Sequence, residues 1–129
     1  MSAREIEVAT RQFFSAFSQN DSKAAAALLS EDLEVIDHVP YRFDSKAEFV
    51  EFLDGFFAGV KSSSAQVRQL SCRMIGDAAG VANAYDTFTA VGKDGKPITG
   101  NGRTTLVFGK EGNEWKIVSC HFSPLPTHG

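Results

Sequence analysis

The sequence predicts an α+β fold, with helices in the first half of the chain and an antiparallel sheet in the second. Apolar residues recur at helical spacing in three segments before residue 60. After Ser64 the apolar period changes to two, and short turns containing glycine separate the later apolar runs. Helices that precede a series of strands are typical of the α+β class rather than of alternating βα units.

Three helices are predicted from their apolar faces and their N-terminal signals. The first begins at Ser2 and Glu5, which have the form of a capping box, where each side chain can bond the other's free amide. Asp21 can cap a short second helix in the alanine-rich segment that follows it. Ser45 and Glu48 form a second capping box at the third helix, which the serine run after Gly59 is expected to end.

Five strands are predicted, one between the second and third helices and four after the third. They cover approximately residues 33–37, 69–74, 81–91, 98–108 and 114–122. The Asp-Gly pair in KDGK (93–96) indicates a hairpin, and the Gly-Asn-Gly segment at 100–102 indicates a bulge or a strand kink. The four later strands form an antiparallel meander, with helices on one face and solvent or a partner subunit on the other.

Composition limits the class of protein. The 129 residues make one ordinary domain, 1–129, and a 43% hydrophobic content can build a core. A net charge of −3 argues against nucleic-acid binding, and no apolar run approaches the ~20 residues of a membrane span. The N-terminus lacks the apolar core of a signal peptide, so we expect a cytoplasmic protein whose Cys72 and Cys120 are buried thiols. No metal-ligand spacing or phosphate loop occurs, so no cofactor and no metal are expected.

The C-terminal segment carries a recognisable pattern. Trp115, Val118, His121 and Ser123 form W-x-x-V-x-x-H-x-S after a threonine-rich strand and a glycine-containing turn. This pattern resembles that of SnoaL-like domains and of the calcium/calmodulin-dependent kinase II association domain, both in the nuclear-transport-factor-2-like superfamily. The segment FFSAFSQNDSKAAAALLSEDLEVID resembles the opening helices and first strand of that superfamily. The resemblance implies a cone, in which a curved antiparallel sheet and three helices enclose a pocket, and a homodimer formed through the outer sheet face.

Asp37 and His38 lie in the segment VIDHVP, where they could be an acid/base pair, two metal ligands or the polar end of a strand. Adjacent residues of a strand point to opposite faces, which argues against a shared proton or metal. The resemblance places Asp37 where ketosteroid isomerases hold their proton-shuttling aspartate. An apolar cone would raise the pKa of such a carboxyl group and make it a better general base. The alternative is a solvated aspartate that bonds to turn amides.

The other groups of an isomerase site are missing from the sequence. Those isomerases place a tyrosine in the first helix, and the matching position here is Phe13 or Phe14, neither of which has a hydroxyl. Their second donor, a protonated acid, matches approximately Thr104, which is a weaker donor. An enolate needs preorganised donors, so steroid isomerisation by that mechanism is not expected. Phe13 and Phe17 are expected to line the cone or to fill its core.

Three further residues are candidates for the pocket. His121 matches the histidine of the H-x-S ending, where it would do acid/base work or anchor a ligand, or would be structural in the sheet or dimer interface. The resemblance places Asp86 at the position of a pocket arginine of the association domain, which attracts acidic ligands. A shared pocket with an aspartate there would prefer cations or hydroxyls to anions. Arg68 could pair with Asp86 if both lie on one face of the sheet. Tyr85, Asp86 or His121 would orient a substrate.

Two functions follow from these residues. The first is a SnoaL-like domain that binds a small, largely apolar molecule, with cofactor-free proton transfer of isomerase, dehydratase or cyclase type and Asp37 as the base. The second is a non-catalytic module for dimerisation or ligand binding, similar to a kinase association domain.

Overall fold

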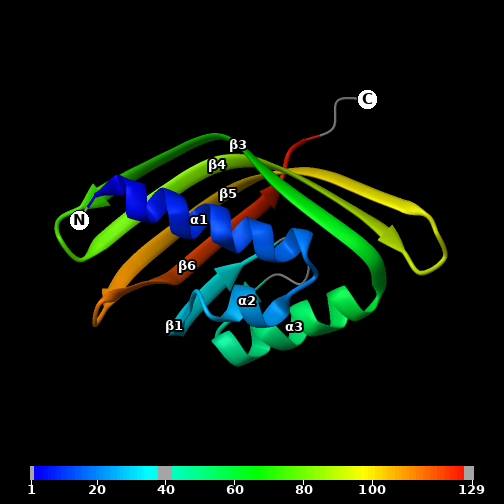
Figure 1. Ribbon diagram of the computed structural model, residues 1–129, viewed down its shortest axis with the longest axis horizontal. Helices are drawn as coiled ribbons and strands as arrows, with labels where there is room; N and C mark the ends of the chain where they lie inside the picture. Colours follow the sequence, from blue (N-terminus) through cyan, green and yellow to red (C-terminus); the bar gives the residue numbers. More distant parts are fainter. Residues whose placement is uncertain (1, 38–41, 127–129) are drawn as a thin grey trace.

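A computed structural model describes residues 2–37 and 42–126 and confirms the α+β class. One six-stranded sheet has the strand order β2-β1-β6-β5-β4-β3, and the helices lie against its concave face (Figure 1). In chain order the elements are α1 Ala3–Ser18, α2 Ser22–Ala26, β1 Leu29–Ile36, β2 Arg42–Phe43, α3 Lys46–Ala58, β3 Val60–Ile75, β4 Ala79–Gly92, β5 Pro97–Glu111 and β6 Glu114–Pro124.

The sheet is mixed and is not closed into a barrel. Strands β3 to β6 form the expected antiparallel meander, but β1 runs parallel to β6. After β1 the chain passes through β2 and α3 into β3, and three successive antiparallel pairings then lead from β3 to β6. Strand β6 therefore runs opposite to β3 and in the same direction as β1. The sheet edges, β2 and β3, do not pair with each other. The expected antiparallel pairing is therefore confirmed for β3 to β6, whereas β1 differs from it by pairing in parallel with β6.

Two of the three predicted helix caps are present. The Asp21 carboxylate accepts the Ala24 amide N–H at 3.0 Å, and the Ser45 hydroxyl accepts the Glu48 amide N–H at 3.2 Å. The capping box at Ser2 is wrong, since the Ser2 side chain makes no cap hydrogen bond. Glu5 instead accepts the indole N–H of Trp115 at 2.9 Å. A buried indole donor requires a partner, and this long-range bond takes the carboxylate from the local one.

The serine run after α3 lies in a strand and does not form a terminating loop. Strand β3 begins at Val60, so the helix passes into the sheet directly. The buried Ser63 hydroxyl donates to the carbonyl oxygen of Phe17 at 2.5 Å, and the Ser18 hydroxyl accepts the Ala65 amide at 3.1 Å. The end of α1 thus supplies a partner for Ser63 and bonds the β3 backbone just after the serine run, and these tertiary contacts hold the run in the strand.

The helices are much shorter than the strands that they cover. The 16 residues of α1 span about 24 Å, whereas the 14 to 16 residues of β3 to β5 span about 46–53 Å. Figure 1 shows α1 over one end of the sheet and α3 displaced toward the other end. Helix α1 approaches β4 closely at Gly80, where a Cβ atom would lie 2.6 Å from Cδ1 of Ile6.

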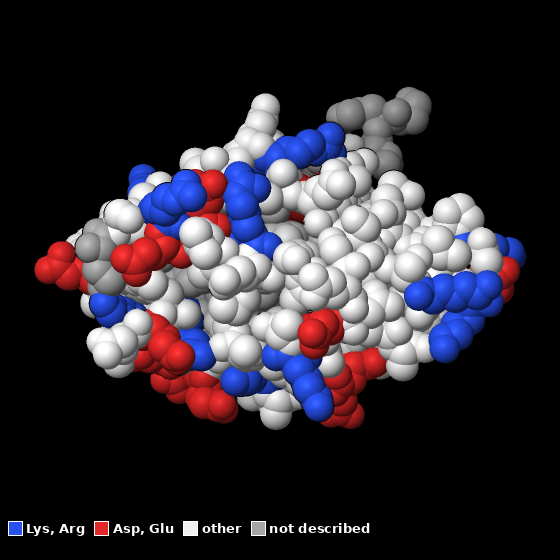
Figure 2. All heavy atoms as spheres, in the orientation of Figure 1, with Lys and Arg blue, Asp and Glu red and all other residues white. Residues whose placement is uncertain are grey.

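One face of the molecule has a broad area without charged side chains. Figure 2 shows this area to the right of centre, in the region where Figure 1 draws β3 in front of the β4–β5 hairpin. Acidic and basic side chains are interspersed around it. Within the residues that the structure describes, no helix is long and apolar enough to span a membrane.

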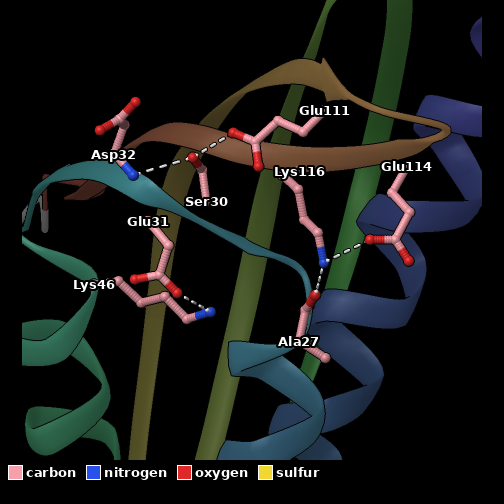
Figure 3. A network of polar contacts seen from close by, with 8 residues as sticks. All are labelled: Ala27, Ser30, Glu31, Asp32, Lys46, Glu111, Glu114 and Lys116. Atoms are coloured by element: carbon pink, nitrogen blue, oxygen red, sulfur yellow. Dashed lines mark hydrogen bonds and ion pairs between the residues drawn. The ribbon is translucent and has the colours of Figure 1, made fainter.

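Polar contacts hold β1 beside the last hairpin of the sheet (Figure 3). The buried Ser30 hydroxyl donates to Glu111 Oε2 at 2.6 Å. Lys116 Nζ donates to the Ala27 carbonyl oxygen at 2.6 Å and lies 3.3 Å from Glu114 Oε2. These bonds join β1 and the segment before it to β5 and β6. They hold the start of β1, whereas its end, which Asp37 follows, is positioned by the pairing of Val35 with Cys120 and of Ile36 with His121.

Candidate functional site

A cavity of about 490 Å³ lies between the concave face of the sheet and the helices, toward the end of the sheet that α1 does not cover. Helices α1 and α3 contribute to its wall together with β3 to β6. Its volume falls within the range of small-molecule sites. Aromatic rings dominate the lining, which includes the seven phenylalanines Phe14, Phe17, Phe49, Phe52, Phe56, Phe88 and Phe122.

Asp37 is a half-buried residue of the cavity wall and directly follows β1. Val35 is fully buried and Ile36 is 46% exposed, so alternation carries Asp37 back to the inner side. Burial raises the pKa of the neighbouring Cys120 thiol, and the negative charge of Asp37 raises that pKa further. The carboxylate is therefore close enough to the core to act on it electrostatically. His38 lies outside the described residues.

Asp86 provides the second carboxylate of the cavity, and the position of its side chain depends on the register between β4 and β5. The buried Thr104 hydroxyl donates to Asp86 Oδ2 at 2.5 Å. Gly102 pairs directly with Asp86, and a Cβ atom there would lie 2.6 Å from Asp86 Oδ1. The missing side chain at Gly102 makes the room that Asp86 occupies. The register between β4 and β5 is unbroken, so the bulge expected in the glycine segment is not present.

Arg68 does not pair with Asp86, because it lies on the outer face of the sheet. Its guanidinium donates to the Thr87 hydroxyl and, at 3.1 Å, to Asn101 Oδ1. Thr87 is the neighbour of Asp86 along β4, and alternation sends the two side chains to opposite faces. The described residues of the cavity wall accordingly include two aspartates and no lysine, arginine or histidine.

His121 and Tyr85 also belong to the outer face. His121 is exposed and lies between the buried Cys120 and the cavity residue Phe122, so it points away from both. Tyr85 is 43% exposed and lies one position before Asp86 on β4. The structure thus separates these two residues from the cavity by the thickness of the sheet.

The predicted aromatic residues divide between core and cavity. Phe13 is fully buried and stacks on Phe122 at a centroid distance of 6.5 Å, whereas Phe14 and Phe17 reach the cavity wall. Of the predicted site residues, the cavity brings together Asp37, Asp86 and Phe17, with Thr104 behind Asp86.

Sequence reasoning missed Phe122 and Gly102. Phe122 could have been found by alternation from Cys120, but the H-x-S motif drew attention to its two neighbours on the other face. The local sequence around Gly102 does not indicate its role, because that role depends on the pairing of Gly102 in β5 with Asp86 in β4.

The arrangement suits proton acceptance or cation binding better than oxyanion stabilisation. A carboxylate in an apolar cavity can remove a proton or bind a positive charge. The Thr104 hydroxyl already donates to Asp86, so it is engaged and does not serve an oxyanion. No group of three or more potential metal ligands occurs within residues 2–37 and 42–126.

A family model described as "SnoaL-like domain" matches residues 6–127 of the chain. The chain belongs to the SnoaL-like domain family. A comparison with curated protein sequences found no significant match.

Solved structures with the same fold as this SnoaL-like domain bear varied names. An NTF2-like superfamily protein from Salmonella enterica has a TM-score of 0.86 at 21% identity, covering 98% of this chain and 93% of that one. A calcium/calmodulin-dependent kinase II association domain assigned in Xanthomonas campestris has a TM-score of 0.84 at 21% identity, covering 95% and 87%. A protein from Novosphingobium aromaticivorans assigned as a scytalone dehydratase has a TM-score of 0.87 at 14% identity, covering 95% and 83%. At these identities the likeness shows the fold alone.

The Thr104–Asp86 bond gives a prediction about stability. We expect Thr104→Val, which keeps the side-chain shape, to lower the free energy of unfolding by about 1–2 kcal/mol, because a half-buried carboxylate loses its donor. Urea titration followed by the fluorescence of Trp115 measures this change. The matched control is Thr105→Val, whose hydroxyl donates to the exposed Asn83 on the outer face and whose loss should cost no more than about 0.5 kcal/mol. Equal losses in the two variants would contradict the role given to Thr104.

Proposed function

We propose that this SnoaL-like domain binds a small, largely apolar molecule in its cavity. The observation that carries the proposal is the combination of a cavity of about 490 Å³ with seven phenylalanines and two carboxylates in its wall. A water-filled surface groove would not need an aromatic lining, and a packed core would not leave this volume. Such a lining removes apolar ligand surface from water, while a few polar groups orient the ligand.

We propose further that Asp37 serves as a general base in cofactor-free proton transfer of isomerase, dehydratase or cyclase type. Its support is its place in the wall of an apolar cavity at the end of a strand that polar contacts hold in position. The neighbour assigned as a dehydratase is consistent with lyase chemistry on this fold. Asp86, held by Thr104, orients the ligand in this scheme, whereas His121 and Tyr85 take no part because they lie on the outer face.

Binding is tested with the neutral fluorescent probe N-phenyl-1-naphthylamine. We expect saturable binding by the native protein and at least about a tenfold loss of affinity in Gly100→Leu. Gly100 lines the cavity and a Cβ atom there meets nothing within 4 Å, so a leucine would occupy ligand space without a clash. Thr89→Leu is the control, because it adds the same side chain at an exposed outer position. Unchanged probe affinity in Gly100→Leu would place the bound probe elsewhere and refute the proposed site.

Proton abstraction is tested with 2-tetralone, a ketone with an aromatic body and acidic C–H groups. We expect the native protein to accelerate exchange of its α-protons in D₂O, followed by NMR, and Asp37→Asn to lose about 100-fold or more of that acceleration. Asp77→Asn, in the exposed β3–β4 turn, removes the same charge and should retain the activity. Equal exchange in the native protein and Asp37→Asn would rule out Asp37 as the base.

The second candidate function is a module that dimerises through the outer sheet face. It is favoured by the exposed Ile36 and Tyr85 on that face and by the neighbour assigned as an association domain. The outer face and the cavity lie on opposite sides of the sheet, so dimerisation and ligand binding are compatible.

Dimerisation predicts a mass of two chains by light scattering. We expect Tyr85→Lys to shift the protein toward the monomer, because a buried interface would have to accept an unpaired charge. Val8→Lys changes an exposed residue of α1, 43% accessible, and should leave the mass unchanged. A strictly monomeric native protein at high concentration would refute the dimer.

A further inference from the structure

One oxygen of the Asp86 carboxylate is engaged within the protein, and the other is open to a ligand. Among the described residues the donor to this carboxylate is Thr104, whose hydroxyl bonds Oδ2 at 2.5 Å. The other oxygen, Oδ1, lies over Gly102, and both residues belong to the cavity wall. Every fully buried side-chain oxygen or nitrogen of the described residues has a hydrogen-bond partner, so Oδ1, which has none there, is accessible.

Strand pairing fixes the position of this acceptor. Asp86 lies opposite Gly102, where a Cβ atom would be 2.6 Å from Oδ1 and 3.0 Å from the Ser123 carbonyl oxygen. Gly102 does not have the positive φ that favours glycine, so its backbone conformation does not require one. What its missing side chain provides is space for the carboxylate. With Thr104 bound to Oδ2 and this space beside Oδ1, the acceptor is held in place before a ligand binds.

Aromatic rings lie near this acceptor. Phe88 follows Asp86 by two positions on β4, so the two side chains share the inner face of the sheet. Phe122 pairs with Thr104 on the neighbouring strand and also lines the cavity. A rigid apolar body that packs against these rings can therefore bring a polar substituent to Oδ1.

The ligand group that matches Oδ1 is a hydrogen-bond donor, and a neutral donor suits the apolar wall best. A carboxylate oxygen accepts hydrogen bonds and does not donate them. Moving a charged group from water into an apolar cavity costs far more free energy than moving a hydroxyl. A hydroxyl carries no net charge, so its affinity depends on the bond to Asp86 rather than on the sum of charges around the cavity.

We propose that Oδ1 of Asp86 accepts a hydrogen bond from a hydroxyl group of the ligand, and that the ligand is a neutral alcohol or phenol with a rigid apolar body. This inference rests on the proposed binding function and names its ligand class. An ether of the same shape has no donor, so it would remove Oδ1 from water without giving it a partner.

Two probes that share one ring system test the need for a donor. They are 2-naphthol and its methyl ether, 2-methoxynaphthalene, and equilibrium dialysis against the native protein measures the affinity of each. At about pH 7 a phenolic hydroxyl keeps its proton. We expect 2-naphthol to bind at least about tenfold more tightly than the ether. The ether is the more apolar probe, so burial of apolar surface alone predicts the opposite order.

Asp86→Asn assigns the preference to Asp86. The amide oxygen can keep the bond from Thr104, and the amide nitrogen then takes the place of Oδ1. This nitrogen donates to an ether oxygen as well as to a hydroxyl oxygen, so the advantage of 2-naphthol should fall to about threefold or less. Asp77→Asn makes the same change in the exposed β3–β4 turn and should keep the full advantage.

Gly102→Ala tests the space that the carboxylate occupies. The added methyl group would meet Oδ1, so Asp86 must turn away and the advantage of 2-naphthol should again fall to about threefold or less. Gly100→Ala adds the same methyl group two positions earlier on β5, where a Cβ atom meets nothing within 4 Å. The ratio of the two affinities in Gly100→Ala should stay at about tenfold or more.

Each outcome bears on a different claim. Equal or tighter binding of the ether by the native protein overturns the hydroxyl-bearing ligand and leaves the binding cavity intact. A full advantage of 2-naphthol in folded Asp86→Asn or Gly102→Ala, as judged by circular dichroism, overturns the site at Asp86. The ratio measured on the native protein decides the ligand class even where a variant does not fold. If neither N-phenyl-1-naphthylamine nor either of the two probes binds, the proposed binding function itself fails.

Discussion

The difference in length between helices and strands is the constraint on which the rest of the structure depends. A 16-residue helix of about 24 Å cannot cover strands of about 46–53 Å, so α1 and α3 divide the concave face between them. At one end α1 approaches the sheet so closely that β4 needs Gly80 beneath Ile6. Where α1 does not reach the sheet, phenylalanine side chains fill part of the space between the sheet and the helices. The volume that they leave unfilled is the cavity.

The chemistry of the cavity is set by strand register. Polar contacts of Ser30 and Lys116 hold the start of β1 beside the β5–β6 hairpin, and Asp37 follows at the other end of that strand. On β4 and β5, an uninterrupted register puts Gly102 opposite Asp86 and brings the Thr104 hydroxyl to its carboxylate. A shift of one residue in either pairing would exchange the inner and outer faces and remove a carboxylate from the cavity.

The two faces of the sheet have different chemical characters. Among the described residues, the inner face joins two carboxylates to an aromatic wall and includes no tyrosine, histidine, lysine or arginine that could donate to an enolate. The outer face carries Tyr85, His121 and Arg68 among hydroxyl and amide side chains, so it offers surface for association without access to the cavity.

The sequence by itself determined the order of the three helices and of five of the six strands, together with two of the three local caps, because periodicity and capping involve residues within one or two turns. Asp21 and Ser45 cap their helices as predicted, and the four-strand meander is where the alternation put it. The tertiary structure decided which residues meet. It moved Glu5 from a local cap to Trp115, and it set Arg68 and His121 on the face away from Asp86. Those outcomes depend on register and on contacts between residues far apart in the chain, which a local pattern of side chains does not encode.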